Sequence, residues 1–310
     1  MRQSKFRSQL EYLLVRTLLA VFGALPLGVG LQLGPPVGSL AYFCAGGRLR
    51  RTGEKNLRLA FPDLDDRQRK ELLRGSFRNF GRLLAVFSHF NRDAKSLKAF
   101  VDCEGLEHLD KAHTNGHGVV LFTGHLGAWE LTSFALALFG HPLSFLVRRI
   151  DNPKIEMLVD RARTQLGNRT VDKRSAAREM LQTLRAGETL GILVDLNTHE
   201  REGIFVDFFG VPASTTFILA KLALRTGARV LPIFAPWDQK RGRFIVKIDE
   251  PLAVPRSGDE DQDVRQLTQS FTNVIEKYVR LYPDQWLWIH RRWKTRPPGS
   301  PPVYEVGARR

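Results

Sequence analysis

The chain is poor in the residues that build covalent or metal frameworks. Its 310 residues include only two cysteines, Cys44 and Cys103, which give neither a disulfide framework nor a metal cluster and are typical of reduced, buried thiols. His113 and His117 straddle an Asn-Gly pair, so they cannot share a helix face, and no cluster of carboxylates accompanies them. The sequence therefore predicts no metal site.

Two motifs that mark other enzyme classes are also missing. No Gly-x-Ser-x-Gly elbow is present, and neither cysteine lies in a nucleophile-like setting, so a covalent acyl-enzyme is not expected. The run Gly28-Val29-Gly30-x-x-x-Gly34 has the wrong spacing for a dinucleotide fingerprint and follows no strand pattern. We therefore expect no bound cofactor.

Acidic residues are scarce at the two ends of the chain. The formal net charge is +15; residues 1–58 hold nine Lys/Arg against two Glu, and residues 291–310 hold six Lys/Arg against one Glu. The body between these ends is nearly neutral, which argues against a broad nucleic-acid-binding face and suits ends that meet an anionic surface. A non-catalytic basic protein that binds membranes or RNA is the alternative from a different class.

One long apolar stretch stands near the start of the chain, at residues 12–33, with a length at the threshold of a membrane span. Arg16 and Pro26 argue against a straight membrane span. A cleaved signal peptide is the competing interpretation, but it is less favoured because no clear small-residue cleavage site precedes a polar start. Gly34-Pro35-Pro36 is expected to turn the chain before a second apolar stretch. We expect a bent or hairpin-like membrane anchor, with an interfacial helix as the alternative because basic residues flank both sides.

Beyond a helix that Asp65 caps and that runs to about Phe87, short apolar runs alternate with helical periodicity. The expected strands are Val119–Phe122, Leu143–Val147, Leu190–Val194, Val230–Phe234 and Phe244–Ile248. The expected helices are 127–139, 154–166, 175–186, 215–226 and 262–281, and the first four end near a C-cap glycine, namely Gly140, Gly167, Gly187 and Gly227. This alternation predicts an α/β fold with a mostly parallel central sheet flanked by helices.

The chain divides into three parts on these patterns. Residues 1–45 form the basic and hydrophobic membrane-associating segment, residues 46–294 form one α/β domain, and residues 295–310 form a tail rich in Pro, Gly and Arg that is expected to be flexible. No internal repeat and no second domain are expected.

The most informative stretch runs from residue 116 to residue 131 and reads GHGVVLFTGHLGAWEL. A predicted strand ends at Gly124 and His125, and Glu130 opens the helix that follows. This spacing places an imidazole on a strand-to-helix turn and a carboxylate in the first helical turn, close enough to touch. The imidazole can then act as a general base whose positive charge the carboxylate balances.

Five blocks together resemble the bacterial lipid A biosynthesis late acyltransferases, within the wider lysophospholipid and glycerol-phosphate acyltransferase superfamily. They are GHLGAWE at 124–130, with the family's His-x4-acid pattern, VRRIDNP at 147–153, GETLGILVD at 187–195, FFGVPAST at 208–215 and WLWIHRRWK at 286–294. The match runs from about residue 10 to residue 296 in the family's order. Residues 46–294 are accordingly expected to form an acyltransferase domain.

The resemblance implies roles for the polar residues of the first three blocks. His125 would deprotonate an acceptor hydroxyl, which attacks an acyl thioester directly, and Glu130 would orient His125 and stabilise its imidazolium. Arg148 would bind an acceptor phosphate or steady the oxyanion, or else be a surface arginine at a strand end. Asp195 would bind substrate at the end of a buried strand, or cap the next turn. Asn152 would contact a ligand, or begin its helix.

The last two blocks are aromatic and basic. The resemblance implies that Phe208, Phe209 and Gly210 line the acyl pocket, although two adjacent Phe are also common in a core or a lid. His290, Arg291 and Arg292 would contact lipid headgroups or an acidic acyl carrier protein. The alternative for this second cluster is a solvated end whose tryptophans pack inward.

The sequence also departs from the family pattern at two places. Val194-Asp195-Leu196-Asn197 stands where the family usually has Pro-Asp-Gln, so a polar contact expected after Asp195 is missing or moved, with His199 and Glu200 as substitutes. Arg149 stands where many members carry proline. These differences concern the acceptor more than the reaction.

The resemblance implies a membrane-associated O-acyltransferase that moves a fatty acyl chain from an acyl carrier protein thioester to a hydroxyl of a lipid A precursor. The expected partners are the carrier protein or acyl-CoA as donor, an anionic glycolipid as acceptor and the membrane surface, with no nucleic acid. The expected location is the bacterial inner membrane, with the catalytic domain on the cytoplasmic side. The alternative function uses acyl-CoA and a phosphatidylinositol mannoside or lysophospholipid.

Overall fold

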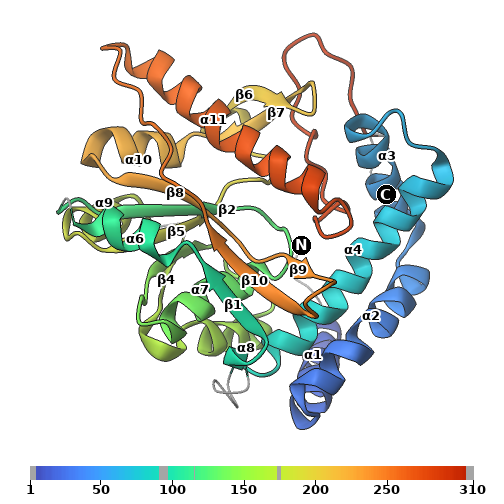
Figure 1. The fold of residues 1–310 in the computed structure, drawn as a ribbon. Coiled ribbons are helices and arrows are strands. Elements are labelled where there is room, and N and C mark those ends of the chain that lie inside the picture. Colours follow the sequence, from blue (N-terminus) through green and yellow to red (C-terminus); the bar gives the residue numbers. More distant parts are fainter. Residues whose placement is uncertain (1–4, 91–96, 115, 173–175, 305–310) are drawn as a thin grey trace.

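A central sheet of eight strands organises the structure, a computed structural model that describes residues 5–90, 97–114, 116–172 and 176–304 (Figure 1). The strands are β1 (Val101–Glu104), β2 (Val119–Thr123), β3 (Ser144–Val147), β4 (Arg169–Asp172), β5 (Thr189–Leu193), β8 (Arg229–Phe234), β9 (Trp237–Asp238) and β10 (Arg243–Ile248). Their order is β1-β10-β8-β2-β5-β3-β4, with β9 paired to β10. The run from β8 to β4 is parallel, whereas β10 is antiparallel to β8. The mostly parallel sheet is thus confirmed, and all five expected strands are present within one residue of their predicted ends.

Helices cover both faces of this sheet, as continuously apolar central strands require. On one face lie α9 (Ala176–Arg185), α10 (Ile218–Thr226) and α11 (Glu260–Leu281); on the other lie α6 (Leu106–His113), α7 (Trp129–Leu138) and α8 (Pro153–Arg163). Strand β2 shows the division, because Val120 and Phe122 belong to the core on the first face and Val119 and Leu121 to the core on the second. Three strands of this sheet were not predicted from the sequence: β1 and β4 have four residues each and are partly polar, and β9 has only two.

Helix ends follow the local chemistry that the sequence predicts. Helix α4 (Asp66–Phe87) begins with a capping box in which Asp65 and Gln68 bond each other's backbone N–H groups. The four expected C-cap glycines all adopt positive φ angles, between 72° and 91°. A short 3₁₀ turn at Gln165–Gly167 follows α8, and another at Glu200–Glu202 precedes a hairpin.

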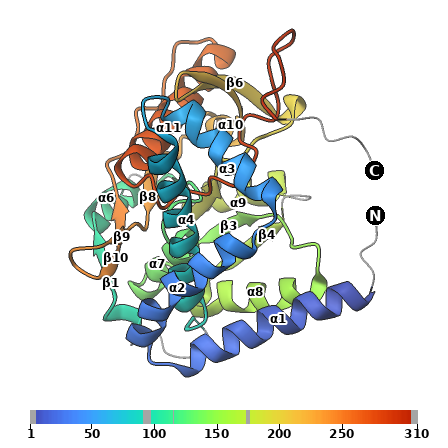
Figure 2. The same cartoon turned by 90° about the vertical axis from the view of Figure 1, so that its right-hand side faces the viewer.

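The first 60 residues form three helices, α1 (Lys5–Ala24), α2 (Leu27–Cys44) and α3 (Gly47–Ala60). The chain turns at Pro26, and α2 continues through Pro35 and Pro36, so the predicted turn at Gly34-Pro35-Pro36 is wrong. Packing overrides the two prolines: α2 lies so close to α4 that a Cβ on Gly81 would come within 1.8 Å of the Gly34 carbonyl oxygen. Figure 2 shows α2 beside α4, and α1 beside α8.

In the part of the chain that the structure describes, no helix is both long and apolar enough to cross a membrane.

The chain also forms a separate hairpin of β6 (Gly203–Phe208) and β7 (Val211–Thr216), which packs on α11. Its two turn residues, Phe209 and Gly210, have φ angles of 58° and 72°, as a tight hairpin turn requires.

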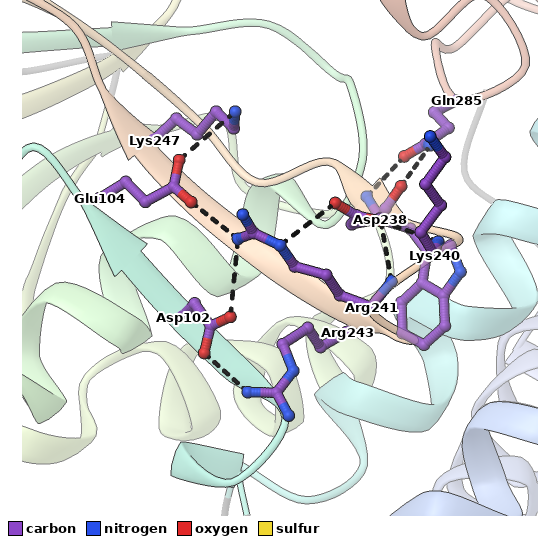
Figure 3. A network of polar contacts seen from close by, with 9 residues as sticks. Asp102, Glu104, Asp238, Lys240, Arg241, Arg243, Lys247 and Gln285 are labelled. Atoms are coloured by element: carbon purple, nitrogen blue, oxygen red, sulfur yellow. Dashed lines mark hydrogen bonds and ion pairs between the residues drawn. The ribbon is translucent and has the colours of Figure 1, made fainter.

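A charged network covers the edge of the sheet at β1 (Figure 3). Arg241 lies 2.8 Å from Glu104 and 3.9 Å from Asp102, while Arg243 lies 2.8 Å from Asp102. Lys247 lies 3.4 Å from Glu104. These partly exposed pairs add little stability each, but charges on an edge strand disfavour pairing with another chain.

The chain beyond residue 294 folds back onto the body, contrary to the expected flexible tail. Thr295 donates its backbone N–H to the side-chain oxygen of Asn197 at 2.8 Å. The buried Tyr304 donates its hydroxyl to Asn56 on α3. The tail is therefore attached up to residue 304, and residues 305–310 lie outside the described part.

Candidate active site

The sheet topology brings His125 and Asp195 together. Strands β2 and β5 are parallel neighbours whose last residues, Thr123 and Leu193, are paired. His125 and Asp195 each follow two residues later, so both lie beyond the carboxyl ends of adjacent strands. This is the edge at which open α/β sheets place their ligands.

The two side chains form a close, directed contact. His125 Nδ1 lies 2.7 Å from one carboxylate oxygen of Asp195, and the His125 backbone N–H donates to the other oxygen, also at 2.7 Å. Trp286 donates its indole N–H to that second oxygen at 2.8 Å. Gly124 is required for this approach, because a Cβ there would come within 3.0 Å of the Asp195 carboxylate.

The electrostatics keep Asp195 ionised. Burial alone would raise the pKa of this carboxyl group, but the His125 ring and the donated N–H groups lower it to about 2. With a carboxylate at Nδ1, the imidazole keeps its proton there, and Nε2 is left as the basic nitrogen. The His125 side chain is 18% exposed and lines a cavity, whereas Asp195 is 1% exposed.

Glu130 occupies the first turn of α7, as predicted, but does not contact His125 through a hydrogen bond in the described structure. Its two carboxylate oxygens accept from Arg163 at 2.8 and 2.5 Å. The prediction that Glu130 orients His125 is therefore wrong: a buried arginine on α8 takes this carboxylate, and Asp195 orients the ring. Burial would lower the pKa of Arg163, but Glu130 raises it above its usual value.

His125, Glu130 and Arg163 line one cavity of about 580 Å³. Its lining also includes the polar residues Arg148 and His290 and the apolar residues Leu121, Leu136, Leu143, Phe145, Ile192 and Ile233. Gly191 in the middle of β5 leaves part of this space open. A Cβ there would come within 2.9 Å of Leu143 and 3.2 Å of Phe145.

His290 belongs to the cavity, and Asn197 holds it. The Asn197 backbone N–H donates to His290 Nε2 at 3.1 Å. Burial lowers the pKa of His290 to about 4, so its imidazole is neutral near pH 7. The polar contact expected beyond Asp195 is thus made by Asn197, and neither His199 nor Glu200 lines the cavity.

The prediction of a headgroup contact is wrong for Arg292, because its side chain is buried. Arg292 is 1% exposed and donates to the Ser214 carbonyl at 2.7 Å and to the Thr215 hydroxyl. Burial lowers its pKa to about 10. Arg291 lies over the Tyr304 ring at 5.5 Å. Both residues hold the C-terminal segment in place. The inward packing of tryptophans that the alternative interpretation expects is present, because Trp288 and Trp293 are fully buried.

Phe208 and Phe209 pack in the core and do not line the cavity. Their ring centroids lie 5.6 Å from Trp286 and 6.4 Å from Trp288, respectively. Gly210 completes the hairpin turn between β6 and β7. The prediction of an acyl pocket at these three residues is therefore wrong, because the hairpin turns its aromatic residues toward the C-terminal tryptophans.

Arg148 and Asn152 separate in the structure. Arg148 directly follows β3 at the cavity, 83% exposed and 3.8 Å from Asp151. Asn152 caps α8 by accepting the Lys154 N–H, donates to the Ser8 carbonyl on α1, and does not line the cavity. Its alternative reading as a helix start is therefore confirmed.

Sequence reasoning missed Arg163 and Trp286. Arg163 is one of several basic residues in an amphipathic helix, and no local signal separates it from the exposed ones. Trp286 lies in the noted C-terminal block, but its contact to Asp195 joins positions 91 residues apart.

The fold and the site together define an α/β protein in which a carboxylate-bonded histidine lines a partly apolar cavity. The family model for bacterial lipid A biosynthesis acyltransferase matches residues 1–295. This chain belongs to that family and is an acyltransferase.

Characterised relatives agree with this assignment. The chain is 27% identical to a lipid A biosynthesis lauroyltransferase of Escherichia coli over 90% of both chains. It is 29% identical to a lipid A biosynthesis palmitoleoyltransferase of Escherichia coli, again over 90% of both. It is 26% identical to a lipid A biosynthesis acyltransferase of Haemophilus influenzae over 81% of this chain and 77% of that protein.

Proposed function

We propose that the protein transfers a fatty acyl chain from an acyl carrier protein thioester to a hydroxyl of a lipid A precursor at the cytoplasmic side of the bacterial inner membrane. The single observation that supports this proposal best is the His125–Asp195 pair, whose imidazole lines a cavity with many apolar lining residues. The family membership supports the acceptor class.

The chemistry follows from the orientation of His125. His125 Nε2 removes the proton of the acceptor hydroxyl while the hydroxyl oxygen attacks the thioester carbonyl carbon. The new C–O bond forms and the C–S bond breaks. The thiolate of the donor leaves and takes the proton back from the imidazolium. Asp195 stabilises the positive charge on the ring during this interval.

The Glu130–Arg163 pair supplies the second part of the site. A guanidinium beside the reacting carbonyl stabilises the negative oxygen that develops during attack. Glu130 fixes the direction of Arg163, because bidentate contacts hold the planar guanidinium in one orientation. Glu130 is thus a positioning residue in this mechanism.

The apolar and polar lining residues of the cavity suit the two substrates. The apolar lining beside Gly191 accepts the acyl chain, and the exposed Arg148 meets an acceptor phosphate. Arg201 also lines the cavity, so the site offers positive charge to an acidic carrier protein. Apolar side chains exposed on α1 and α2, such as Phe6, Leu14 and Leu40, support attachment to a membrane surface.

A reconstituted assay tests the proposal. Purified wild type is incubated in detergent micelles with a lipid A precursor and either acyl carrier protein thioesters or acyl-CoA. We expect transfer from the carrier protein, a loss of kcat of about 10²–10⁴-fold for His125→Ala and of similar size for Asp195→Asn. His117→Ala changes an exposed histidine outside the cavity and is the matched control.

Two results would contradict this proposal. Near-normal turnover by His125→Ala would remove the mechanism. Transfer from acyl-CoA to a phosphatidylinositol mannoside or lysophospholipid, with none to the lipid A precursor, would replace the substrates and keep the chemistry.

A further inference from the structure

A second cavity, of about 390 Å³, is lined by residues of the end of α2, of α3 and of the start of α4. None of the residues that line it lines the active-site cavity. The lining is strongly basic, with a single carboxylate, and consists of Tyr42, Phe43, Gly47, Arg50, Arg51, Glu54, Lys70 and Arg74. We call this the basic pocket.

The cations of the basic pocket are poorly compensated. The side chains of Arg50, Arg51 and Lys70 form no hydrogen bond or ion pair with any other described residue. Arg74 lies 3.8 Å from Glu71, and its buried Nε has no hydrogen-bond partner among the described residues. Four positive groups around one carboxylate in a concave site concentrate a positive potential there.

Aromatic rings hold these cations in place. Arg50 and Arg74 lie over the Tyr42 ring at 5.7 and 5.4 Å, and Arg74 also lies over Phe43 at 5.5 Å. Stacking on a ring uses the guanidinium face and leaves its N–H groups for an oxyanion. Helix α3 begins beside the pocket at Gly47, and its N-cap Gly46 offers no side-chain cap to the first N–H groups.

Exposed apolar side chains lie in the pocket lining and next to it in sequence. Phe43, which lines the pocket, is 60% exposed, and Leu40 on α2 and Leu49 on α3 are 63% and 42% exposed. We call these three side chains the apolar rim. The exposed large hydrophobic side chains of the described residues all lie on α1–α3 except Met157, Leu166 and Leu281. Water-exposed apolar groups beside a positive pocket match a molecule with a phosphate at one end and hydrocarbon at the other.

The geometry points to a binding site for one anionic membrane phospholipid. Its phosphate would enter the basic pocket between Arg50, Arg51 and Arg74, and its acyl chains would run along Phe43 and Leu40. An acidic protein partner would satisfy the charge but would leave this apolar rim uncovered or facing polar surface, so the lipid is the better match. The site would attach the N-terminal helices to anionic lipid and would take no part in acyl transfer.

Vesicle binding tests this assignment with the full chain. Flotation compares binding to phosphatidylcholine vesicles and to vesicles that also contain phosphatidylglycerol, for wild type and for Arg50→Gln/Arg51→Gln. The control variant is Lys55→Gln/Arg67→Gln. It removes two exposed cations from α3 and α4, two of the helices that line the pocket, at positions outside the pocket. We expect the pocket variant to lose about tenfold or more in affinity for the anionic vesicles only, and the control to lose far less.

Other outcomes would overturn the assignment. Equal losses in both double variants would show diffuse charge attraction, and an unchanged pocket variant would show no role for the pocket. If millimolar inorganic phosphate alone abolished the binding of wild type to anionic vesicles, the pocket would be a free-phosphate site. Weakened binding of acyl carrier protein by the pocket variant, with vesicle binding intact, would assign the pocket to the donor.

Acyl transfer in detergent micelles distinguishes the phospholipid site at the basic pocket from the proposed acyltransferase function. The pocket variant is expected to keep wild-type kcat and acceptor KM there, with an unchanged melting temperature. A raised acceptor KM would make the basic pocket part of the acceptor site and would overturn its assignment to a separate membrane lipid.

Discussion

At the scale of single residues, the site depends on which carboxylate reaches the histidine. Glu130 is near His125 in sequence, yet the His125 ring bonds to Asp195 instead. The carboxylate of Glu130 accepts hydrogen bonds from Arg163. Asp195 also receives N–H groups from the His125 backbone and from Trp286, so its charge is compensated from several directions. The ring of the proposed catalytic base is therefore held by a residue 70 positions away.

The lowered pKa of Asp195 predicts a specific loss of stability in acid. The folded-state pKa is about 2, below the ordinary value of 3.8. A depressed carboxyl pKa contributes stability that is complete above the unfolded-state pKa and is lost as the pH falls through the folded-state pKa. The contribution is about 2 kcal/mol by linkage, disappearing between about pH 4 and pH 2.

Urea unfolding at steps from pH 5 to pH 2.5 measures this contribution. The wild type should lose free energy of unfolding in that window faster than Asp195→Asn, whose amide does not titrate. Parallel acid profiles for the two proteins would show that Asp195 is not held ionised by its neighbours.

At the scale of elements, two close approaches depend on glycine, one between helices and one within a strand. Gly34 and Gly81 let α2 and α4 meet backbone to backbone, and Gly191 leaves space between β5 and its neighbours Leu143 and Phe145. The first contact sets the position of the N-terminal helices. The second shapes the apolar lining of the active-site cavity.

Gly81→Val should destabilise the protein by about 1–3 kcal/mol, the usual range for overpacking. Its added Cβ would lie 1.8 Å from the Gly34 carbonyl oxygen, and backbone cannot rotate away as a side chain can. Thermal unfolding followed by circular dichroism measures the change. Gly46→Ser is the control, since a Cβ at Gly46 meets no atom within 4 Å; a stability of Gly81→Val equal to this control would refute the close packing.

Gly191→Val should shift the donor preference toward shorter acyl chains. The new side chain would occupy the space between Leu143 and Phe145 that lines the cavity. Competition among carrier proteins bearing 10-, 12- and 14-carbon chains gives the ratio of kcat/KM values directly. Ile233→Val, which enlarges the same lining, should move the ratio the other way. An unchanged ratio in Gly191→Val would place the acyl chain elsewhere.

At the scale of the whole molecule, the C-terminal segment joins the N-terminal helices to the active site. Asn56 on α3 donates to the Trp288 and His290 carbonyls at 2.7 and 2.6 Å and accepts from Tyr304. The same segment supplies Trp286 to Asp195 and His290 to the cavity. Residues far apart in the chain therefore act as one unit.

Asn56→Ala should cost about 1–3 kcal/mol, because it leaves buried carbonyl groups without a donor. It should also lower kcat, since the segment that carries Trp286 and His290 loses an attachment. Unfolding curves and turnover in micelles check both effects, with Lys55→Ala on the same helix as the exposed control. A destabilised variant with unchanged kcat would show that the attachment serves stability alone.

The amino-acid order by itself determined five strands of the central sheet, most helices beyond residue 60, the capping residues and the position of His125 on a strand-to-helix turn. These features depend on residues close together in the chain, through apolar periodicity and backbone chemistry, so they can be read locally. The family blocks added the reaction class.

Only the tertiary structure decided which groups meet. It paired His125 with Asp195 and Glu130 with Arg163, buried Arg292 and the Phe208–Phe209 pair, and carried α2 through its prolines. Each of these outcomes depends on parallel strand neighbours or on helix contacts between residues distant in sequence. A carboxylate bonds to the donor that the fold places nearest in space, and sequence spacing does not contain that distance.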